Sequence, residues 1–114
     1  MREANLEGIQ LDNGFLVEAD FSGSNLRNAL FLGANLSHAN LSRANLDGAD
    51  LGGSHLINAN LERANLLGAS LMEVNLTGAN LEQAILTGAD FDHALVETKW
   101  RAFIERSGVK NGDK

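Results

Sequence analysis

The stretch that decides the fold is a five-residue phrase, and residues 39–53 give three copies in a row: Ala-Asn-Leu-Ser-Arg, Ala-Asn-Leu-Asp-Gly and Ala-Asp-Leu-Gly-Gly. Outward from these copies, Leu or Phe stands at every fifth position from Leu6 to Phe91, eighteen times without an insertion. A small residue, usually Ala, stands two positions before each, and Asn or Asp usually lies between. A fixed period of this kind indicates a repeat architecture.

A five-residue period fits neither ordinary element. On an α-helix, Leu residues five apart would be rotated by about 140°, and on a straight strand they would alternate between faces. The pattern becomes consistent if the chain turns a corner once per phrase, with the small residue and Leu facing inward and Asn outward. Four corners close a square coil of twenty residues, so residues twenty apart stack. The phrases in residues 4–95 predict an all-β solenoid of about four and a half coils, roughly 20–22 Å long.

The corners are predicted to be type II turns wherever Gly takes the second turn position, because that position needs a positive φ. Asn at this position tolerates the same geometry. Arg43, Arg63 and Gln83 stand there instead and imply another turn type.

These phrases resemble the pentapeptide repeat family, whose motif is Ala-(Asp/Asn)-Leu-X-X. The resemblance implies a right-handed quadrilateral β-helix, and the handedness comes from the resemblance alone. Departures at the small position and at the Asn position do not shift the register; they are Ile9, Gly14, Val74, Phe15, Leu30, His55 and Ile85.

The phrase dissolves after Phe91. Residues 96–109 are predicted to form a short capping α-helix over the last coil, with Trp100, Phe103 and Ile104 packing from one face. A partner-binding helix is the competing interpretation.

The ends of this helix have their own signals. Thr98 is a plausible N-cap, and Gly108 fits the position just after the helix, with Val109 as its hydrophobic partner. Residues 110–114 are predicted to be a frayed tail.

The net charge is −6 and there is no Cys, so a disulfide framework and thiolate metal ligation are excluded. Residues 1–95 hold twelve acids against four Arg, and this acidity argues against direct nucleic-acid binding. No run reaches transmembrane length and the first residues lack a signal-peptide core, so no membrane contact and a cytoplasmic location are expected. A fragment of a longer protein, or a lost targeting segment, is the alternative.

No catalytic, metal or cofactor site is predicted. The only histidines, His38, His55 and His93, fall in three different stacked columns without metal-ligand spacing. Carboxylates lie on convex outer faces, and inner columns of Leu and Ala leave no cavity for a cofactor. The chain is therefore interpreted as non-enzymatic.

Two candidate interaction surfaces stand out. Phe15 and Val17 point outward beside an uncapped first coil, near Leu30 and Leu32 on the neighbouring face; they are either ordinary surface residues or the contact of a homodimer. One face also mixes acidic and apolar side chains, as a protein-binding strip or as surface drift. Its members are Asp12, Leu30, Leu32, Asp50, Met72, Asp90 and Asp92.

The leading functional hypothesis is a rigid scaffold or protein-interaction module with an unidentified protein partner. The alternative comes from the family, some of whose members are similar to a DNA duplex in shape and charge, bind topoisomerases such as gyrase and protect against quinolones. Negative charge favours this DNA-mimic hypothesis. A short rod, acids on several faces and the lack of an inserted loop weaken it, although an N-terminal dimer would double the length.

Overall fold

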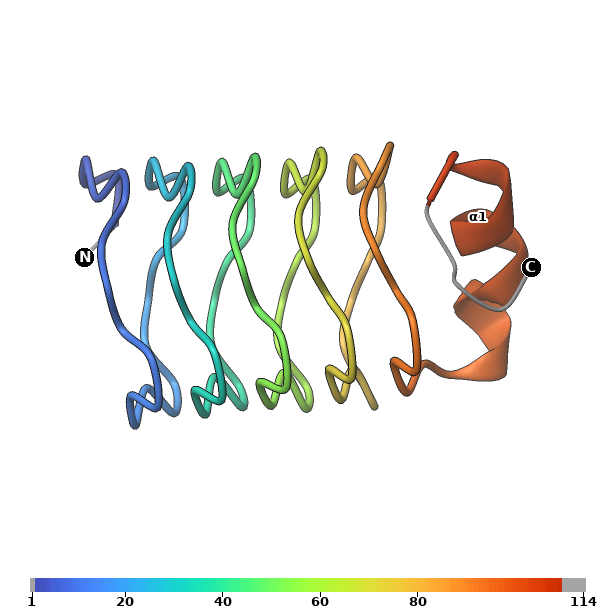
Figure 1. Ribbon diagram of the computed structural model, residues 1–114, viewed down its shortest axis with the longest axis horizontal. Coiled ribbons are helices and arrows are strands. Elements are labelled where there is room, and N and C mark those ends of the chain that lie inside the picture. Colours follow the sequence, from blue (N-terminus) through green and yellow to red (C-terminus); the bar gives the residue numbers. More distant parts are fainter. Residues whose placement is uncertain (1, 110–114) are drawn as a thin grey trace.

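Each phrase forms one side and one corner of a square coil, and the coils stack along a single axis (Figure 1). The computed structural model describes residues 2–109. Fifteen isolated parallel bridges join residues twenty apart, from Asn5 with Asn25 to Asn75 with Leu95. Each side is extended over only about three residues, so the sides pair through single bridges rather than long strands. The predicted quadrilateral β-helix of about four and a half coils is confirmed.

All the corners share one turn. At each of eighteen corners, the carbonyl of the inward Leu or Phe accepts a hydrogen bond from the amide three residues later, such as Ala49 N to Leu46 O at 2.9 Å. The second turn residue has a positive φ at every one of these corners, whether or not it is Gly. This combination of hydrogen bond and dihedral angle is that of a type II turn.

The expectation of another turn type at Arg43, Arg63 and Gln83 is wrong, because φ is 59° at all three. This left-handed conformation costs a non-glycine residue roughly 1–2 kcal/mol. Bonds between coils offset the cost, since the amide of the turn residue donates to the next coil, as Arg43 N does to Glu62 O at 2.9 Å. The stack therefore imposes the same turn on residues that do not favour it.

The outward Asn or Asp has a structural role at the corner. Its side-chain oxygen accepts the amide of the first turn residue, as Asn45 Oδ1 does from Asp47 at 3.1 Å and Asn60 Oδ1 does from Glu62 at 3.0 Å. Asn side chains also bond between coils, with Asn65 Nδ2 donating to Asn45 Oδ1 at 3.3 Å. Asn is thus explained by a turn amide that needs a partner.

The inward side chains fill a narrow interior. Buried Leu side chains from Leu26 to Leu86 are at most 1% exposed, and Phe21 packs edge-to-face on Phe31 with ring centroids 5.9 Å apart. The first coil differs, because nothing in residues 2–109 covers its N-terminal side. Its inward side chains are only partly buried; they are Leu6, Ile9, Leu11 and Leu16.

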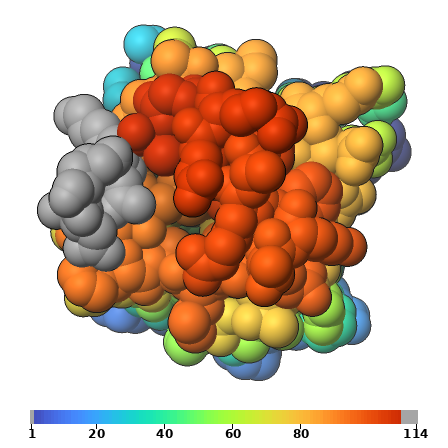
Figure 2. All heavy atoms as spheres, turned by 90° about the vertical axis from the view of Figure 1, so that its right-hand side faces the viewer, coloured from blue at the N-terminus to red at the C-terminus, as the bar shows by residue number. Residues whose placement is uncertain are grey.

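A short cap lies across the C-terminal end of the solenoid (Figure 2). It consists of a 3-10 helix, η1 (Thr98–Trp100), followed by α1 (Arg101–Arg106). Ile104 is 7% exposed, and the half-buried Trp100 donates from Nε1 to Ala79 O at 3.2 Å. The rings of Trp100 and Phe103 lie 6.0 Å apart. Ile104 belongs to the buried core, and Trp100 and Phe103 are partly buried against it.

The predicted ends of the cap are only partly right. The helical residues are 98–106, fewer than the expected 96–109. Thr98 is not the N-cap: Glu97 precedes η1, and no side chain caps it. Gly108 has the expected left-handed conformation at φ 76°, with its carbonyl accepting from Gly88 N at 2.8 Å. The predicted frayed tail, 110–114, lies outside the described residues.

Candidate protein-interaction surface

One of the four faces, here called the acidic face, consists of the outward residues that stack on Gln10, Asp12 and Asn13 at steps of twenty. It carries no Lys or Arg, and its carboxylates are Asp12, Asp50, Glu73, Asp90 and Asp92. On the opposite face, Arg2, Arg43 and Arg63 offset three of the four acids. Acids occur on every face, as expected, but unbalanced negative charge is concentrated on this one.

A groove crosses the middle of the acidic face. It has a volume of about 320 Å³ and is lined by Leu32, Asp50, Gly52, Gly53, Ser70, Met72 and Glu73. The groove exists because Gly52 has no side chain between two coils that carry exposed apolar ones. Leu32 is 45% exposed on the preceding coil and Met72 is 41% exposed on the following coil. The floor is thus backbone, and the walls are flexible apolar side chains.

The carboxylates around the groove are held in place by the backbone. Asp50 Oδ1 accepts the amide of Gly52 at 3.0 Å, and Asp12 Oδ1 accepts the amide of Leu32 at 2.8 Å. Within residues 2–109, the second carboxylate oxygen of Asp12 and of Asp50 makes no hydrogen bond. The face therefore presents oriented negative charge beside an apolar hollow, which suits a basic group next to an apolar side chain.

The structure separates the predicted surface residues into two groups. Asp50, Leu32 and Met72 meet in the groove, with Leu30 half-buried and Asp90 toward the C-terminal end of the same face. The other group is Phe15, 81% exposed, and half-buried Val17, on the next face of the first coil.

Sequence reasoning missed the two glycines and Glu73. Gly52 and Gly53 were interpreted only as turn residues. The available signal was the absence of a side chain at position 52 between Leu32 and Met72, twenty residues to either side.

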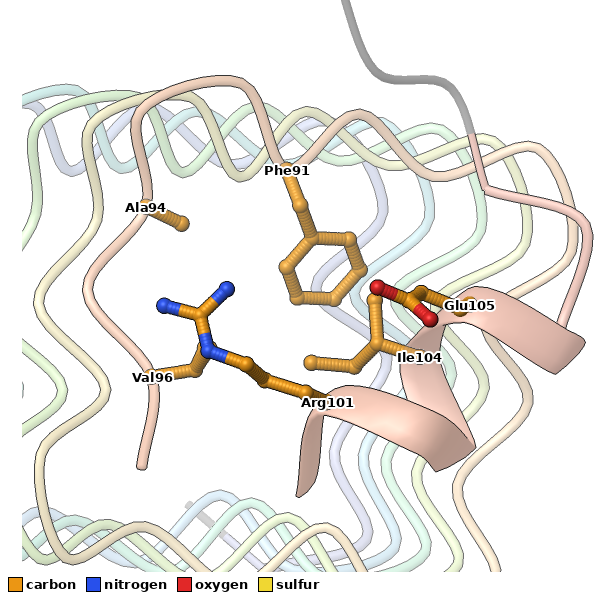
Figure 3. Close-up of a pocket in the computed structure, with 6 residues that line it drawn as sticks. All are labelled: Phe91, Ala94, Val96, Arg101, Ile104 and Glu105. Atoms are coloured by element: carbon orange, nitrogen blue, oxygen red, sulfur yellow. The ribbon is translucent and has the colours of Figure 1, made fainter. Parts of the chain in front are cut away.

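A second hollow lies under the cap, between α1 and the last coil (Figure 3). Figure 3 shows Ile104 pointing toward Phe91, with the Arg101 side chain extending over the hollow. Its volume is about 70 Å³, and it is lined by Phe91, Ala94, Val96, Arg101, Ile104 and Glu105. Known cofactor and substrate pockets usually measure roughly 300–1,000 Å³, so this hollow suits a pair of waters at most.

The histidines do not come together. His38 and His55 lie in different positions on one face, and His93 lies on the acidic face, 3.1 Å from Asp92 Oδ1 through its Nδ1. No group of three metal-ligating side chains occurs within residues 2–109. In the same part of the chain, neither helix is long and apolar enough to cross a membrane.

The chain belongs to the pentapeptide repeat family. The family profile, described as pentapeptide repeats in eight copies, matches residues 16–53, 39–78 and 54–92. The predicted family and the predicted right-handedness of the β-helix are thereby confirmed. No curated protein matches the sequence.

Solved structures of the family share this architecture. Rfr23 from the cyanobacterium Cyanothece 51142 is 31% identical with a TM-score of 0.80, over 96% of this chain and 85% of that one. A pentapeptide repeat protein from the thylakoid lumen of Arabidopsis thaliana is 32% identical with a TM-score of 0.71, over 91% and 76%. QnrB1, a plasmid-mediated fluoroquinolone resistance protein, shares the fold at 22% identity and a TM-score of 0.60; the match covers 96% of this chain but 58% of a trypsin-treated QnrB1 variant.

Proposed function

We propose that the protein is a non-catalytic, rigid scaffold that binds a protein partner through its acidic face. The observation that carries the proposal is the Gly52 groove, which has apolar walls on a face with five carboxylates and no Lys or Arg. A matching partner segment places an apolar side chain in the groove and a flanking Lys or Arg beside the carboxylates. Direct binding to nucleic acid or to an anionic membrane is not part of the proposal, because both would repel this face.

The rigidity of the face supports a binding role. Coil-to-coil and turn hydrogen bonds surround the groove, including Gly53 N to Met72 O at 2.8 Å and Leu51 N to Ser70 O at 2.8 Å. A surface that is already ordered loses little conformational entropy when it binds, so more of the contact energy is available for affinity. The non-catalytic part rests on the family and on the separated histidines.

An NMR titration with two short peptides tests the proposal. Acetylated and amidated Lys-Leu-Lys should shift the amide signals of Gly52, Gly53 and Ser70 in a saturable way, with weak affinity because the contact is small. The charge-reversed peptide Glu-Leu-Glu should leave those signals unchanged at the same concentration. Shifts of equal size from both peptides, or shifts spread over all four faces, would count against the acidic face as the binding site.

Two matched variants locate the site. Gly52→Leu fills the groove and should abolish the shifts, whereas Ser42→Leu places the same side chain at the equivalent turn position of the opposite face and should not. Glu73→Gln keeps the shape of an exposed side chain at the groove and should weaken binding, because it removes one charge. An unchanged titration of the Gly52 variant would remove the groove from the proposal.

A second candidate is an acidic DNA mimic that binds the type II topoisomerase gyrase. The one-sided charge of the acidic face supports it, and so does a cross-section of 21 × 20 Å, about the width of a duplex, although the molecule is only 35 Å long. The apolar walls of the groove interrupt the acidic row, which favours the scaffold. Inhibition of gyrase supercoiling at tens of micromolar, lost in a variant with Asp50→Asn and Asp90→Asn, would establish the mimic; no inhibition would remove it.

A further inference from the structure

The N-terminal edge of the first coil presents unpaired backbone groups. In later coils, the outward residue of each side makes two backbone hydrogen bonds with the preceding coil. Asn25 N, for example, donates to Ala4 O at 2.9 Å, and Asn25 O accepts from Leu6 N at 2.8 Å. In the first coil the equivalent residues are Asn5, Gln10, Phe15 and Asp20. Within residues 2–109, no backbone hydrogen bond reaches the amide or the carbonyl of any of these four. An edge of this kind is a template for pairing.

The apolar interior also opens toward this edge. Inward side chains that are at most 1% exposed in the middle coils have only partly buried counterparts in the first coil, such as Leu11 and Leu16. Phe15, in the outward row, is the most exposed large apolar side chain among the described residues, at 81%. Covering the end of the solenoid would therefore satisfy backbone groups and remove apolar surface from water together.

We propose that this edge pairs with the same edge of a second copy of the chain, giving a head-to-head dimer. A two-fold axis perpendicular to the solenoid makes the facing sides antiparallel. In an antiparallel pair, opposite residues that each offer an amide and a carbonyl exchange two hydrogen bonds. Asn5, Gln10, Phe15 and Asp20 each offer this arrangement. A two-fold rotation also preserves the hand of the coil, so the two rising edges stay parallel and several sides can pair at once.

The C-terminal end favours this arrangement over an open filament. Head-to-tail stacking would require the N-terminal edge to meet the last coil. The cap of η1 and α1 lies across that coil (Figure 1). Ile104 is buried there, and Trp100 Nε1 donates to Ala79 O. Within residues 2–109 the N-terminal edge is the end left open, and a contact of this edge with itself closes at two copies.

The size and charge of the end set the strength of the dimer. The end of the solenoid measures 21 × 20 Å, which gives a contact area of roughly 400 Å² per copy. The dimer would then bury a total area of about 800 Å², less than the roughly 1,200–2,000 Å² that stable interfaces bury. The dimer is therefore weak and should form only at high protein concentration. The first coil holds Glu3, Glu7, Asp12, Glu18 and Asp20 against Arg2, and Glu7 is paired with Arg27 of the next coil at 3.1 Å, so the edge keeps a net negative charge. Repulsion between the two edges weakens the dimer, which becomes stronger when salt screens the charge.

Sedimentation equilibrium from 20 µM to 1 mM tests the proposal. The weight-average mass should rise from 12.2 kDa toward twice that value, and should rise further at 500 mM than at 50 mM NaCl. Phe15→Asp should weaken association at least tenfold by adding charge at the contact. Leu95→Asp is the matched control, because Leu95 stacks in the same column at the other end and is 60% exposed; it should associate like the unmodified chain.

A backbone variant separates edge pairing from side-chain contact. Gln10→Pro removes an amide that has no acceptor within the described part of the chain, so it should weaken the dimer while far-UV circular dichroism stays unchanged. If this variant does not fold, Phe15→Asp still decides the question. A monomer at 1 mM, equal weakening by Leu95→Asp, or growth beyond the dimer would each overturn the proposal.

Discussion

Replacing Ser54 by Ala should stabilise the protein, because the Ser54 hydroxyl is buried without a partner. Ser54 takes an inward position at which most phrases have Ala, and it is 1% exposed. Among the described residues, its Oγ makes no hydrogen bond. Burying an unpaired hydroxyl costs about 1–3 kcal/mol, which the substitution removes. Part of this gain is cancelled, because the missing oxygen atom no longer makes dispersion contacts in the packed interior. We expect the free energy of unfolding to rise by about 1 kcal/mol.

The same substitution at Ser24 should have the opposite sign. Ser24 is also inward and 1% exposed, but its Oγ accepts the amide of Ala4 at 3.1 Å. Ser24→Ala leaves that amide without its partner and should lower the free energy of unfolding by about 1 kcal/mol. Urea denaturation followed by far-UV circular dichroism measures both changes, and the slope m should not change. If both variants shift the midpoint in the same direction by similar amounts, burial of the unpaired hydroxyl does not determine the effect and the reasoning fails.

Three further predictions concern the corners, the interior and one carboxylate. Gly68→Ala should lower the free energy of unfolding by about 0.5–1 kcal/mol. At φ 65° the new side chain is strained, although its methyl group would touch nothing, and the lower entropy of the unfolded chain offsets part of that strain. An unchanged urea midpoint would contradict this. Leu56→Ala should lower the free energy of unfolding by about 3–4 kcal/mol, because Leu56 is fully buried between coils. Leu11→Ala should lower it by less than half of that, because Leu11 is only partly buried. Equal losses would show that the first coil is covered in solution. The pKa of Asp20 is lowered mainly by the hydrogen bond from the Ser22 hydroxyl, then by that from the Ser22 amide, so Ser22→Ala should raise it in an NMR titration. A carboxylate whose pKa is lower in the folded state stabilises the fold at pH values above the unfolded pKa of about 3.9, and this contribution is lost as the pH falls through the folded pKa. The stability difference between the unmodified protein and Ser22→Ala should therefore be larger at pH 6 than at pH 2.5.

The coil could be predicted from the sequence because a five-residue period is incompatible with every straight element. Once a corner is required at each phrase, the inward and outward positions follow, and so does the stacking of residues twenty apart. Leu46 and Ala49 are buried for this reason, at 0% and 1% exposure. The Asn position was predicted to face outward, and the structure adds the physical cause, which is the turn amide that its side chain accepts.

The corners at Arg43 and Arg63 show where local preference misleads. Arg is not favoured at positive φ, so the sequence alone indicates a different turn. In the stack, the turn residue must direct its amide at the next coil, and Arg63 N does so to Glu82 O at 2.9 Å. A bond repeated from coil to coil outweighs a preference of roughly 1–2 kcal/mol. The start of the cap was also misassigned, because Thr98 is the first residue of η1 and Glu97 precedes it without a side-chain cap.

The groove could not be predicted from single residues, because it is produced by the missing side chain of Gly52. Gly52 satisfies the repeat as well as any other first turn residue, and the hollow appears only when the coils before and after it supply Leu32 and Met72. The charge of each face, by contrast, can be counted once the twenty-residue stacking is accepted. The candidate site was therefore predictable in its charge and in three of its residues, but not in its shape.

The fold itself restricts where function can be encoded. The small residue, the Leu and the second turn residue are required by the interior and the corner, and the Asn position is partly required by the turn amide. The first turn residue is the least restricted, because its amide is satisfied by a neighbouring side chain and its own side chain points into water. On the acidic face this position holds Asp12, Leu32, Gly52, Met72 and Asp92. Asp12 has a role in the β-helix, because its Oδ1 accepts the amide of Leu32. No such role explains the apolar side chains on either side of a glycine in the middle, and recognition of an apolar partner side chain with a basic neighbour would explain them.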